Sequence, residues 1–439
     1  MKKILFSLFA LHFSLVEAFA ADDCRGQKHA PDGELTLTQV VELGLCRNPT
    51  TAAAYLSLES SRLSKNAGYA GYLPSVSANA GIERSFNGRH WAGDPGANLG
   101  LSASWLIFDF GKRLADLNAL AAVWRATGFD YDESVQNFVY SLIGSYYGLL
   151  TADADVKTAE SLRIVAQTAK DTADKKFKAG VVARADVLKA DTTLASRELD
   201  LQRARNNREI ARGKLLSQLS FAATDEIKIA DMPSNFGSAA ESKTIEELLA
   251  VAKKQRPDLL RADENKNAAW HRRNSAVLKN LPSISASGSI SYYSSVDEFA
   301  PSVDRSGGSI GIRASMPLFA GFANVYGARA AQANLDAADQ RLRAADDNAT
   351  LDVFTAFANY KTARTVLAQT VVLLKSATES EKLTAGMYKV GKATMLDWQN
   401  AQAELASAEK QSNSAKYDLF VKRAALALAV GDIKQELGN

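Results

Sequence analysis

Side chains capable of catalysis or metal binding are few in this sequence, and their spacing fits no reactive arrangement. Beyond residue 20 the histidines are His29, His90 and His271, which lie in three unrelated segments without metal-ligand spacing. No nucleophile elbow, phosphate-binding loop or dinucleotide fingerprint occurs where a strand leads into a helix. Aspartate and glutamate are plentiful but are spread along predicted helix faces as solvated charge. We therefore expect no enzymatic activity, no bound metal and no cofactor.

The two cysteines, Cys24 and Cys46, are the other residues with chemistry of their own. A metal or redox site would call for a CxxC spacing or nearby histidines, and neither arrangement is convincing here. In an oxidising compartment an even pair of cysteines more often forms a disulfide. The pair therefore predicts a disulfide that pins the N-terminal segment to the first helix.

Residues 1–20 have the organisation of a secretory signal peptide. Lys2 and Lys3 form a basic start, residues 4–16 are mostly apolar, and residues 18–20 supply the small-x-small cleavage pattern. We expect this segment to be removed and the protein to leave the bacterial cytoplasm.

The rest of the composition narrows the class of protein. Beyond residue 20 no uninterrupted apolar stretch reaches the ~18 residues that mark a membrane helix. Membrane insertion would then depend on alternating β-strands, which hydropathy detects poorly. The formal net charge of +3 is close to balance, which argues against nucleic acid as a partner.

An internal repeat is the strongest organising signal in the chain. The early landmarks are a capping-box threonine, a proline and a Leu-Pro-Ser strand start, and they recur 208 residues apart: Thr36 and Thr244, Pro49 and Pro257, Leu73 and Leu281. The later landmarks recur 211 residues apart: Phe108 and Phe319, Gly180 and Gly391, Asp186 and Asp397. The three extra residues must therefore lie in the loop between the two strands of the second repeat.

Each repeat predicts the same order of elements. A capped helix comes first, over about 36–70 in one repeat and over 244–279, with a break near Pro257, in the other. A β-hairpin, a long helix, a tip and a second long helix follow. The hairpins fall at about 73–108 and 281–319, and the tips at about 179–186 and 390–397. The chain divides into a signal peptide (1–20), an N-terminal segment (21–35), repeat 1 (36–225), an equatorial linker (226–243), repeat 2 (244–432) and a tail (433–439).

The long helices carry narrow apolar stripes. Val135, Val139, Leu142, Tyr146 and Leu149 step by four and three residues, which is typical of a coiled-coil seam. Ala401, Ala408 and Ala415 recur every seven residues, and small residues at this period let helices approach closely. Such stripes are too narrow for the core of a compact enzyme.

The predicted strands alternate apolar and polar side chains and reach the 9–11 residues that cross a tilted bilayer. Four strands cannot close a barrel, and open sheet edges are not tolerated in lipid. Two copies would supply eight strands, whose interior fills with side chains, whereas three copies would supply twelve. If the strands lie in a membrane, a trimer is the smallest assembly that conducts.

The ordered, duplicated motifs resemble those of the TolC family of outer-membrane efflux proteins over essentially the whole chain after residue 20. The residues that carry the resemblance are Leu35-Thr36-Leu37 to Asn48-Pro49, the paired Leu-Pro-Ser strand starts, Trp105 to Gly111, Phe177 to Asp186, and Tyr388 to Asp397. The resemblance implies an α+β membrane protein, in which a trimer forms a twelve-stranded outer-membrane β-barrel continuous with a long periplasmic α-helical barrel. It also implies a Gram-negative outer membrane as the location and outer-membrane lipid as the surroundings.

The resemblance further implies partners and a gate. The partners are a periplasmic adaptor protein and an inner-membrane ABC or proton-driven transporter. The tips form an iris-like entrance, and the positions matching the family's constriction are Asp186, Asp397, Tyr388 and Asn400. The sequence departs from the family pattern at two positions. Ala393 stands where the best-known member of the family has an arginine that links the tips, and Asn400 stands where that member has a second aspartate. Lys392 and Arg184 are candidates for the missing cation.

The tip residues also have purely structural interpretations. Asp186 and Asp397 begin helices, where aspartate is favoured as a cap and by the helix dipole. Gly180 and Gly391 fit left-handed helix ends. An adaptor must approach the same tips, which makes Gly180, Val181, Gly391 and Lys392 candidates for docking.

The function that these features indicate is a passive outer-membrane exit duct for small molecules or for protein in type I secretion. A soluble periplasmic coiled-coil scaffold or adaptor is the alternative. Such a protein would not need four strands of bilayer length that end in aromatic residues.

Overall fold

The computed structural model describes residues 29–31, 33–84, 86–87, 90–91, 96–231, 244–295 and 303–433. The predicted signal peptide, Cys24, most of the predicted linker and the tail beyond residue 433 lie outside these residues, as does the side chain of His90. The chain forms two compact units. Unit 1 combines residues up to 54 with 132–256 and 348–439, and unit 2 combines 55–131 with 257–347.

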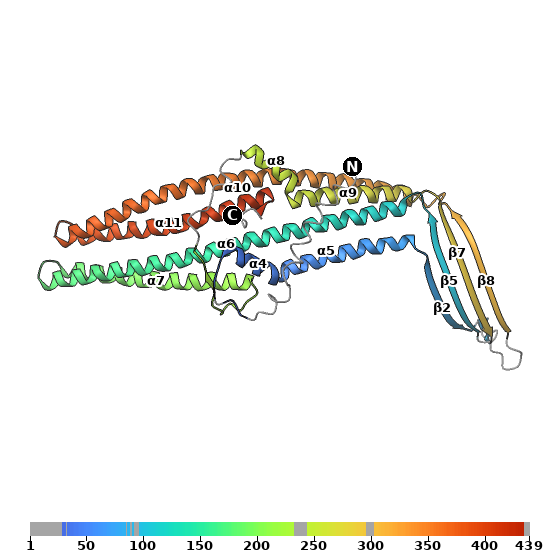
Figure 1. Ribbon diagram of the computed structural model, residues 1–439, viewed down its shortest axis with the longest axis horizontal. Coiled ribbons are helices and arrows are strands. Elements are labelled where there is room, and N and C mark those ends of the chain that lie inside the picture. The colour runs from blue at the N-terminus through green and yellow to red at the C-terminus, as the bar shows by residue number, and fades with distance from the viewer. Residues whose placement is uncertain are drawn as a thin grey trace. The chain divides into compact units, whose positions relative to one another are not determined.

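Unit 1 is built from two long helical hairpins, one from each repeat (Figure 1). Its helices are α4 (Leu37–Arg47), the later part of α6 (Lys112–Lys178), α7 (Arg184–Gln218), α8 (Ile245–Gln255), the later part of α10 (Ala323–Lys389) and α11 (Met395–Val430). Ion pairs between Arg208 and Asp153 and between Arg205 and Glu160 join α6 to α7. Beside the helices, β1 (Glu34–Leu35) pairs in parallel with β6 (Lys228–Ile229).

The predicted seam lies at the core of unit 1. Val139, Leu142, Tyr146 and Leu149 are all buried, and Leu142 is fully enclosed. Tyr146 also donates its hydroxyl to the carbonyl of Ala230 at 2.6 Å, and burial raises its pKa to about 12. The alanines predicted at seven-residue spacing on α11, namely Ala401, Ala408 and Ala415, are buried as well. The periodicity therefore identified the inward face of both helices.

The N-terminal part of unit 1 is tied to the end of α7. Arg47 donates to the carbonyls of Leu219 and Ser220, and its guanidinium lies 4.1 Å from the centre of the Phe221 ring. Cys46, one residue earlier, is disulfide-bonded. Its predicted partner Cys24 lies outside the described residues.

Unit 2 contains a second set of helices and the main sheet. The helices are the later part of α5 (Pro49–Gly68), the short η1 (Tyr69–Tyr72), the first part of α6, α9 (Pro257–Leu278) and the first part of α10. A bidentate ion pair between Arg125 and Glu264 joins α6 to α9. Lys266 pairs with Asp339 at 2.6 Å and joins α9 to α10.

The main sheet has four antiparallel strands in the order β2-β5-β7-β8 (Figure 1). The strands are β2 (Ser75–Glu83), β5 (Gly96–Phe108), β7 (Ser283–Ser295) and β8 (Val303–Ser315). The short β3 (Phe86–Asn87) and β4 (His90–Trp91) pair with each other. Both predicted hairpins are confirmed, and β5 and β7 join them across the repeat boundary.

Apolar side chains on one face of this sheet are exposed. Ile82, Ile310 and Ile312 are 85%, 94% and 75% exposed, and they alternate along their strands with serine, glycine and charged residues. A contiguous exposed apolar face of this kind marks an interaction surface.

Helix boundaries confirm the capping boxes and correct one helix. Thr36 and Thr244 each accept from the backbone of the residue three positions later, and the side chains of Gln39 and Glu247 bond back. The predicted continuous helix over about 36–70 is wrong. It is split into α4 and α5 because Pro49 disfavours helical geometry at the preceding Asn48, whose ψ is 124°.

No described helix has the combination of length and apolarity that crossing a membrane would require.

Candidate functional site at the helix-hairpin tips

Both hairpin tips in unit 1 turn in the same way. At the end of α6 the amide of Val181 bonds the carbonyl of Lys176, and Gly180 has φ +72°. At the end of α10 the amide of Lys392 bonds the carbonyl of Met387, and Gly391 has φ +79°. This is the Schellman motif, which requires a left-handed residue and therefore favours glycine. The structural interpretation of both glycines is confirmed.

The two aspartates occupy the same helix position with different contacts. Asp397 is the third residue of α11, where its carboxylate accepts from the amide of Thr394 at 2.8 Å and from its hydroxyl at 2.6 Å. These bonds hold the pKa of Asp397 below its usual range. Asp186 is the third residue of α7, where Ala183 is the N-cap and makes no side-chain cap. The capping interpretation therefore holds for Asp397, which forms a capping box with Thr394. At Asp186 no capping bond is seen, and its structural interpretation rests on the favourable interaction of its charge with the helix dipole.

Tyr388 lies inside the unit, in contact with the other hairpin. Its side chain is 2% exposed and its ring lies 5.2 Å from that of Trp398. The two rings and Met395 form a buried cluster with Ala173 and Ala190 of the first hairpin. The Tyr388 hydroxyl is buried and has no hydrogen-bond partner among the described residues. Burial, and secondarily the charge of Asp186, raise the pKa of this hydroxyl.

A lysine of the first hairpin closes this cluster. Lys176 donates to the backbone carbonyl of Tyr388, and its ammonium lies 4.1 Å from the centre of the Tyr388 ring. The contact combines a charge-assisted hydrogen bond with a cation–π interaction. Lys392 and Arg184, the predicted candidates for a tip cation, are both exposed. Among the described residues, the cation seen to contact the other hairpin at the tips is Lys176.

Two further contacts at the tips were not predicted. The Trp398 indole donates to Glu381 at 2.8 Å within the second hairpin. The Gln399 amide donates to the Thr193 hydroxyl at 2.7 Å and so joins α11 to α7. Sequence patterns could have indicated Trp398, which lies one residue after Asp397 at the start of a periodic apolar stripe. Nothing in the sequence pairs Gln399 with Thr193.

The outer surface of the tips carries the remaining predicted residues. Gly180, Gly391, Lys392 and Asn400 are exposed, and Val181 is 67% exposed. Val390, which was not predicted, is 70% exposed beside Gly391. The structure thus brings Tyr388 and Asp186 into one neighbourhood and leaves the predicted docking residues on the surface.

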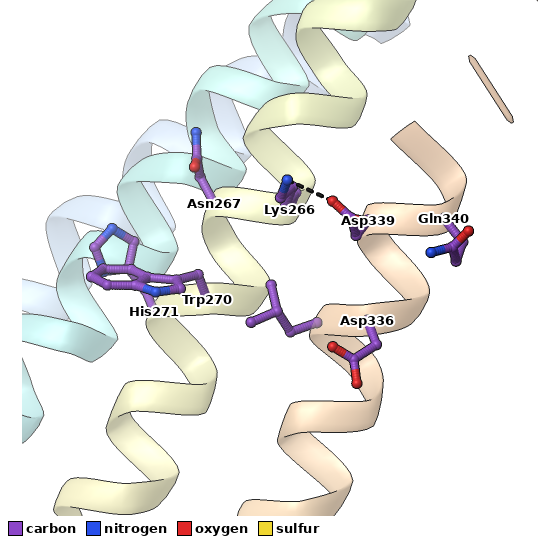
Figure 2. Close-up of a pocket in the computed structure, with 8 residues that line it drawn as sticks. Lys266, Asn267, Trp270, His271, Asp336, Asp339 and Gln340 are labelled. Carbon is purple, nitrogen blue, oxygen red and sulfur yellow. Dashed lines mark ion pairs between the residues drawn. The ribbon is translucent and has the colours of Figure 1, made fainter. Parts of the chain in front are cut away.

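A second candidate site is an open groove between α9 and α10 in unit 2, of about 670 Å³. Figure 2 shows the Lys266–Asp339 ion pair bridging it and Trp270 beside His271. Burial, and secondarily the charge of Arg125, lower the pKa of His271. Within the described residues no group of acidic, histidine or cysteine side chains is arranged to hold a metal ion. The groove offers an ion pair and an aromatic surface.

Comparisons with known proteins agree on one class. The sequence profile of the family described as outer membrane efflux protein matches residues 40–219 and 248–432. Protein CyaE of Bordetella pertussis is 25% identical over 409 residues, which cover 91% of this chain and 85% of that protein. Outer membrane protein TolC of Vibrio cholerae is 23% identical over 344 residues, which cover 76% and 74%.

Solved structures share the fold. The outer-membrane channel OprN superposes with a TM-score of 0.79 at 22% identity, covering 93% of this chain and 95% of its own. Outer membrane protein VceC from Vibrio cholerae superposes with a TM-score of 0.77 at 18% identity, covering 90% and 96%.

Proposed function

Because the chain belongs to the outer membrane efflux protein family, we propose that it is the passive exit duct of a tripartite export system. The chain is an outer-membrane channel that extends into the periplasm, and its family is a class of transport ducts rather than of enzymes. This family assignment argues against the alternative of a soluble periplasmic coiled-coil scaffold or adaptor. The cargo is either small molecules or protein, and the duct itself leaves this choice to the pump and adaptor.

Three copies assemble in this proposal, and their twelve strands close one barrel. The four-stranded sheet supports it, because β2 and β8 are its outer strands and their unpaired backbone edges need partners in lipid. The exposed isoleucines on one face fit contact with outer-membrane lipid. Native mass spectrometry of the detergent-solubilised protein measures the copy number.

The tips are the proposed docking site for a periplasmic adaptor, which in turn connects the duct to an ABC or proton-driven pump in the inner membrane. The observation that carries this proposal is the pair of exposed valines beside left-handed glycines, Val181 next to Gly180 and Val390 next to Gly391. Exposed apolar side chains on rigid turns are suited to pack against a partner helix. Lys392 adds a charge at the rim.

Site-specific photocrosslinking in intact cells tests this docking. A photoreactive residue at Val181 or Lys392 should capture a periplasmic adaptor. The matched control is Leu199, which is 60% exposed on α7 outside the tip. Equal capture from Leu199, or capture of no adaptor from the tips, would contradict the docking site.

The gate is proposed at the same tips, with Asp186 and Asp397 as the acidic positions and Asn400 and Tyr388 completing the constriction. Intrachain contacts support it, since Lys176 holds Tyr388 across the two hairpins. Single-channel conductance of Asp186→Asn and Asp397→Asn tests the acidic positions. Cation preference should fall, as should the block by multivalent cations. If both stayed at the wild-type level, the acidic gate would be refuted.

A further inference from the structure

The internal repeat extends to the strand register of the sheet. Ser75 pairs with Ser104 in the first hairpin, and Ser283 pairs with Ser315 in the second. These positions correspond under the offsets of 208 and 211 residues that the sequence landmarks define. The side-chain contacts also correspond, because Ser75 bonds the carbonyl of Ser104 at 3.2 Å and Ser283 bonds that of Ser315 at 3.4 Å. The two hairpins are therefore structural copies in register.

The pairing of β5 with β7 shows how one repeat joins the next. Ala103 lies opposite Gly288 in this ladder. Applying the repeat offsets moves β5 onto β8 and β7 onto β2, so that Ala314 falls opposite Ala80 of another copy. Within the same register Ile312 falls opposite Ile82. The pairing of β5 with β7 inside one chain thus predicts, residue by residue, how β8 of one copy would pair with β2 of another.

The side chains on the two edges agree with this register. Ala314 and Ile312 belong to the apolar face of β8, and Ala80 and Ile82 belong to the apolar face of β2. A shift by one residue would place apolar side chains against polar ones across the seam. β8 stops at Ser315, two residues before Pro317, which cannot donate to a ladder.

An unpaired polar atom on the polar face of the sheet is a second, independent observation that favours this pairing between copies. Gly81 of β2 lies opposite Asn98 of β5, and a Cβ built on Gly81 would approach Asn98 Oδ1 to 2.5 Å. That oxygen is buried and has no hydrogen-bond partner among the described residues. In the specified register Arg313 of a second copy falls opposite Gly81, in line with Asn98. Because Gly81 has no Cβ, the Asn98 amide lies over it, and a turn of this side chain would present Oδ1 to Arg313 of the second copy.

The charges on the two edges are complementary as well. Arg313 is exposed on β8 and Glu83 is exposed on β2. Opposite Gly81, Arg313 lies diagonally from Glu83, two residues along the same face, which is within reach of long side chains. A register shifted by two residues toward Asn79 would separate these charges.

We propose that β8 of one copy pairs antiparallel with β2 of a second copy so that Arg313 lies opposite Gly81, bonding Asn98 Oδ1 and pairing with Glu83. The contact rests on the proposed assembly of three copies and fixes its strand register. Three such seams, identical by symmetry, close the sheet.

Paired cysteines in the full-length protein, in outer membranes, test the register. Ala80→Cys with Ala314→Cys should yield disulfide-linked dimers and trimers on non-reducing gels, because directly opposite strand residues approach disulfide distance. Ala78→Cys or Ile82→Cys with Ala314→Cys are the offset controls. Each single cysteine variant shows the background from the native cysteines.

Each outcome decides the proposal. Strongest linkage from the Ala80 pair supports the register. Strongest linkage from an offset pair overturns the register while the assembly of copies stands. No linkage from a protein that is still trimeric by native mass spectrometry overturns edge pairing. No linkage from a monomeric protein overturns the proposed function together with this inference.

A charge exchange tests Arg313 without cysteines. Arg313→Glu should lower the temperature at which the oligomer dissociates, and adding Glu83→Arg should restore it. Arg305→Ala, on the same strand and face, is the control that should have the smaller effect. If the double exchange were no more stable than Arg313→Glu alone, the pairing with Glu83 would be wrong.

Discussion

Replacing Tyr388 by phenylalanine removes a hydroxyl that contributes no hydrogen bond. The side chain is 2% exposed, and its hydroxyl has no partner among the described residues. Burying an unpaired polar group costs about 1–3 kcal/mol, so its removal should leave the two hairpins joined or strengthen their contact by about 1 kcal/mol. Tyr388→Phe is therefore expected to keep the two hairpins in contact.

Replacing Lys176 by methionine should have the opposite effect. The substitution keeps the apolar stem but removes the ammonium that lies 4.1 Å from the Tyr388 ring and donates to its carbonyl. A cation–π contact contributes about 0.5–1 kcal/mol and a hydrogen bond from a charged group about 1.5–3 kcal/mol. A loss of about 2 kcal/mol would shift the equilibrium between joined and separated hairpins about 30-fold.

Single-channel recording of the full-length protein in planar bilayers measures both variants. Lys176→Met should increase the time spent in high-conductance states, whereas Tyr388→Phe should match the wild type. Lys175→Met is the matched control, since Lys175 is exposed one position earlier on α6. The opposite result would be a larger open fraction in Tyr388→Phe together with wild-type conductance in Lys176→Met. It would show that the Tyr388 hydroxyl, interacting with Asp186, keeps the channel closed and that Lys176 does not.

Further substitutions test the core, the turns and the pH dependence. Leu142→Ala empties a fully buried position and should lower the free energy of unfolding by about 3 kcal/mol, measured by chemical denaturation. Gly391→Ala places a Cβ at φ +79° and should cost about 1 kcal/mol in the same assay. The folded-state pKa of Asp397 is lowered, so its stabilisation is present above the unfolded pKa and lost as the pH falls through the folded value. Asp397→Asn should therefore be less stable than the wild type at neutral pH and equal to it in acid, by thermal unfolding. Burial raises the pKa of Glu409, which reverses the sign, so Glu409→Gln should be more stable than the wild type at neutral pH, with the difference shrinking as the pH falls.

The repeat, the strand pairs and the tip turns were predictable because they depend on local rules. Capping boxes at Thr36 and Thr244 and left-handed ends at Gly180 and Gly391 follow from backbone geometry within a few residues. The alternation of apolar and polar residues along each strand predicted which side chains share a face of the sheet. The predicted continuous helix over 36–70 is wrong because Pro49 keeps the residue before it, Asn48, out of helical geometry.

Tertiary structure alone decided which tip residues meet. Phe177 and Tyr388 are equivalent positions of the two repeats, yet Phe177 is 42% exposed and Tyr388 is 2% exposed. The sequence presents them as equals. They differ because the second hairpin packs its aromatic face onto the alanines of the first within one chain, whereas the aromatic face of the first hairpin has no third hairpin to cover it among the described residues. Lys176 could not be predicted for the same reason, since its partner lies 212 residues away along the chain and comes near only when the two hairpins pack.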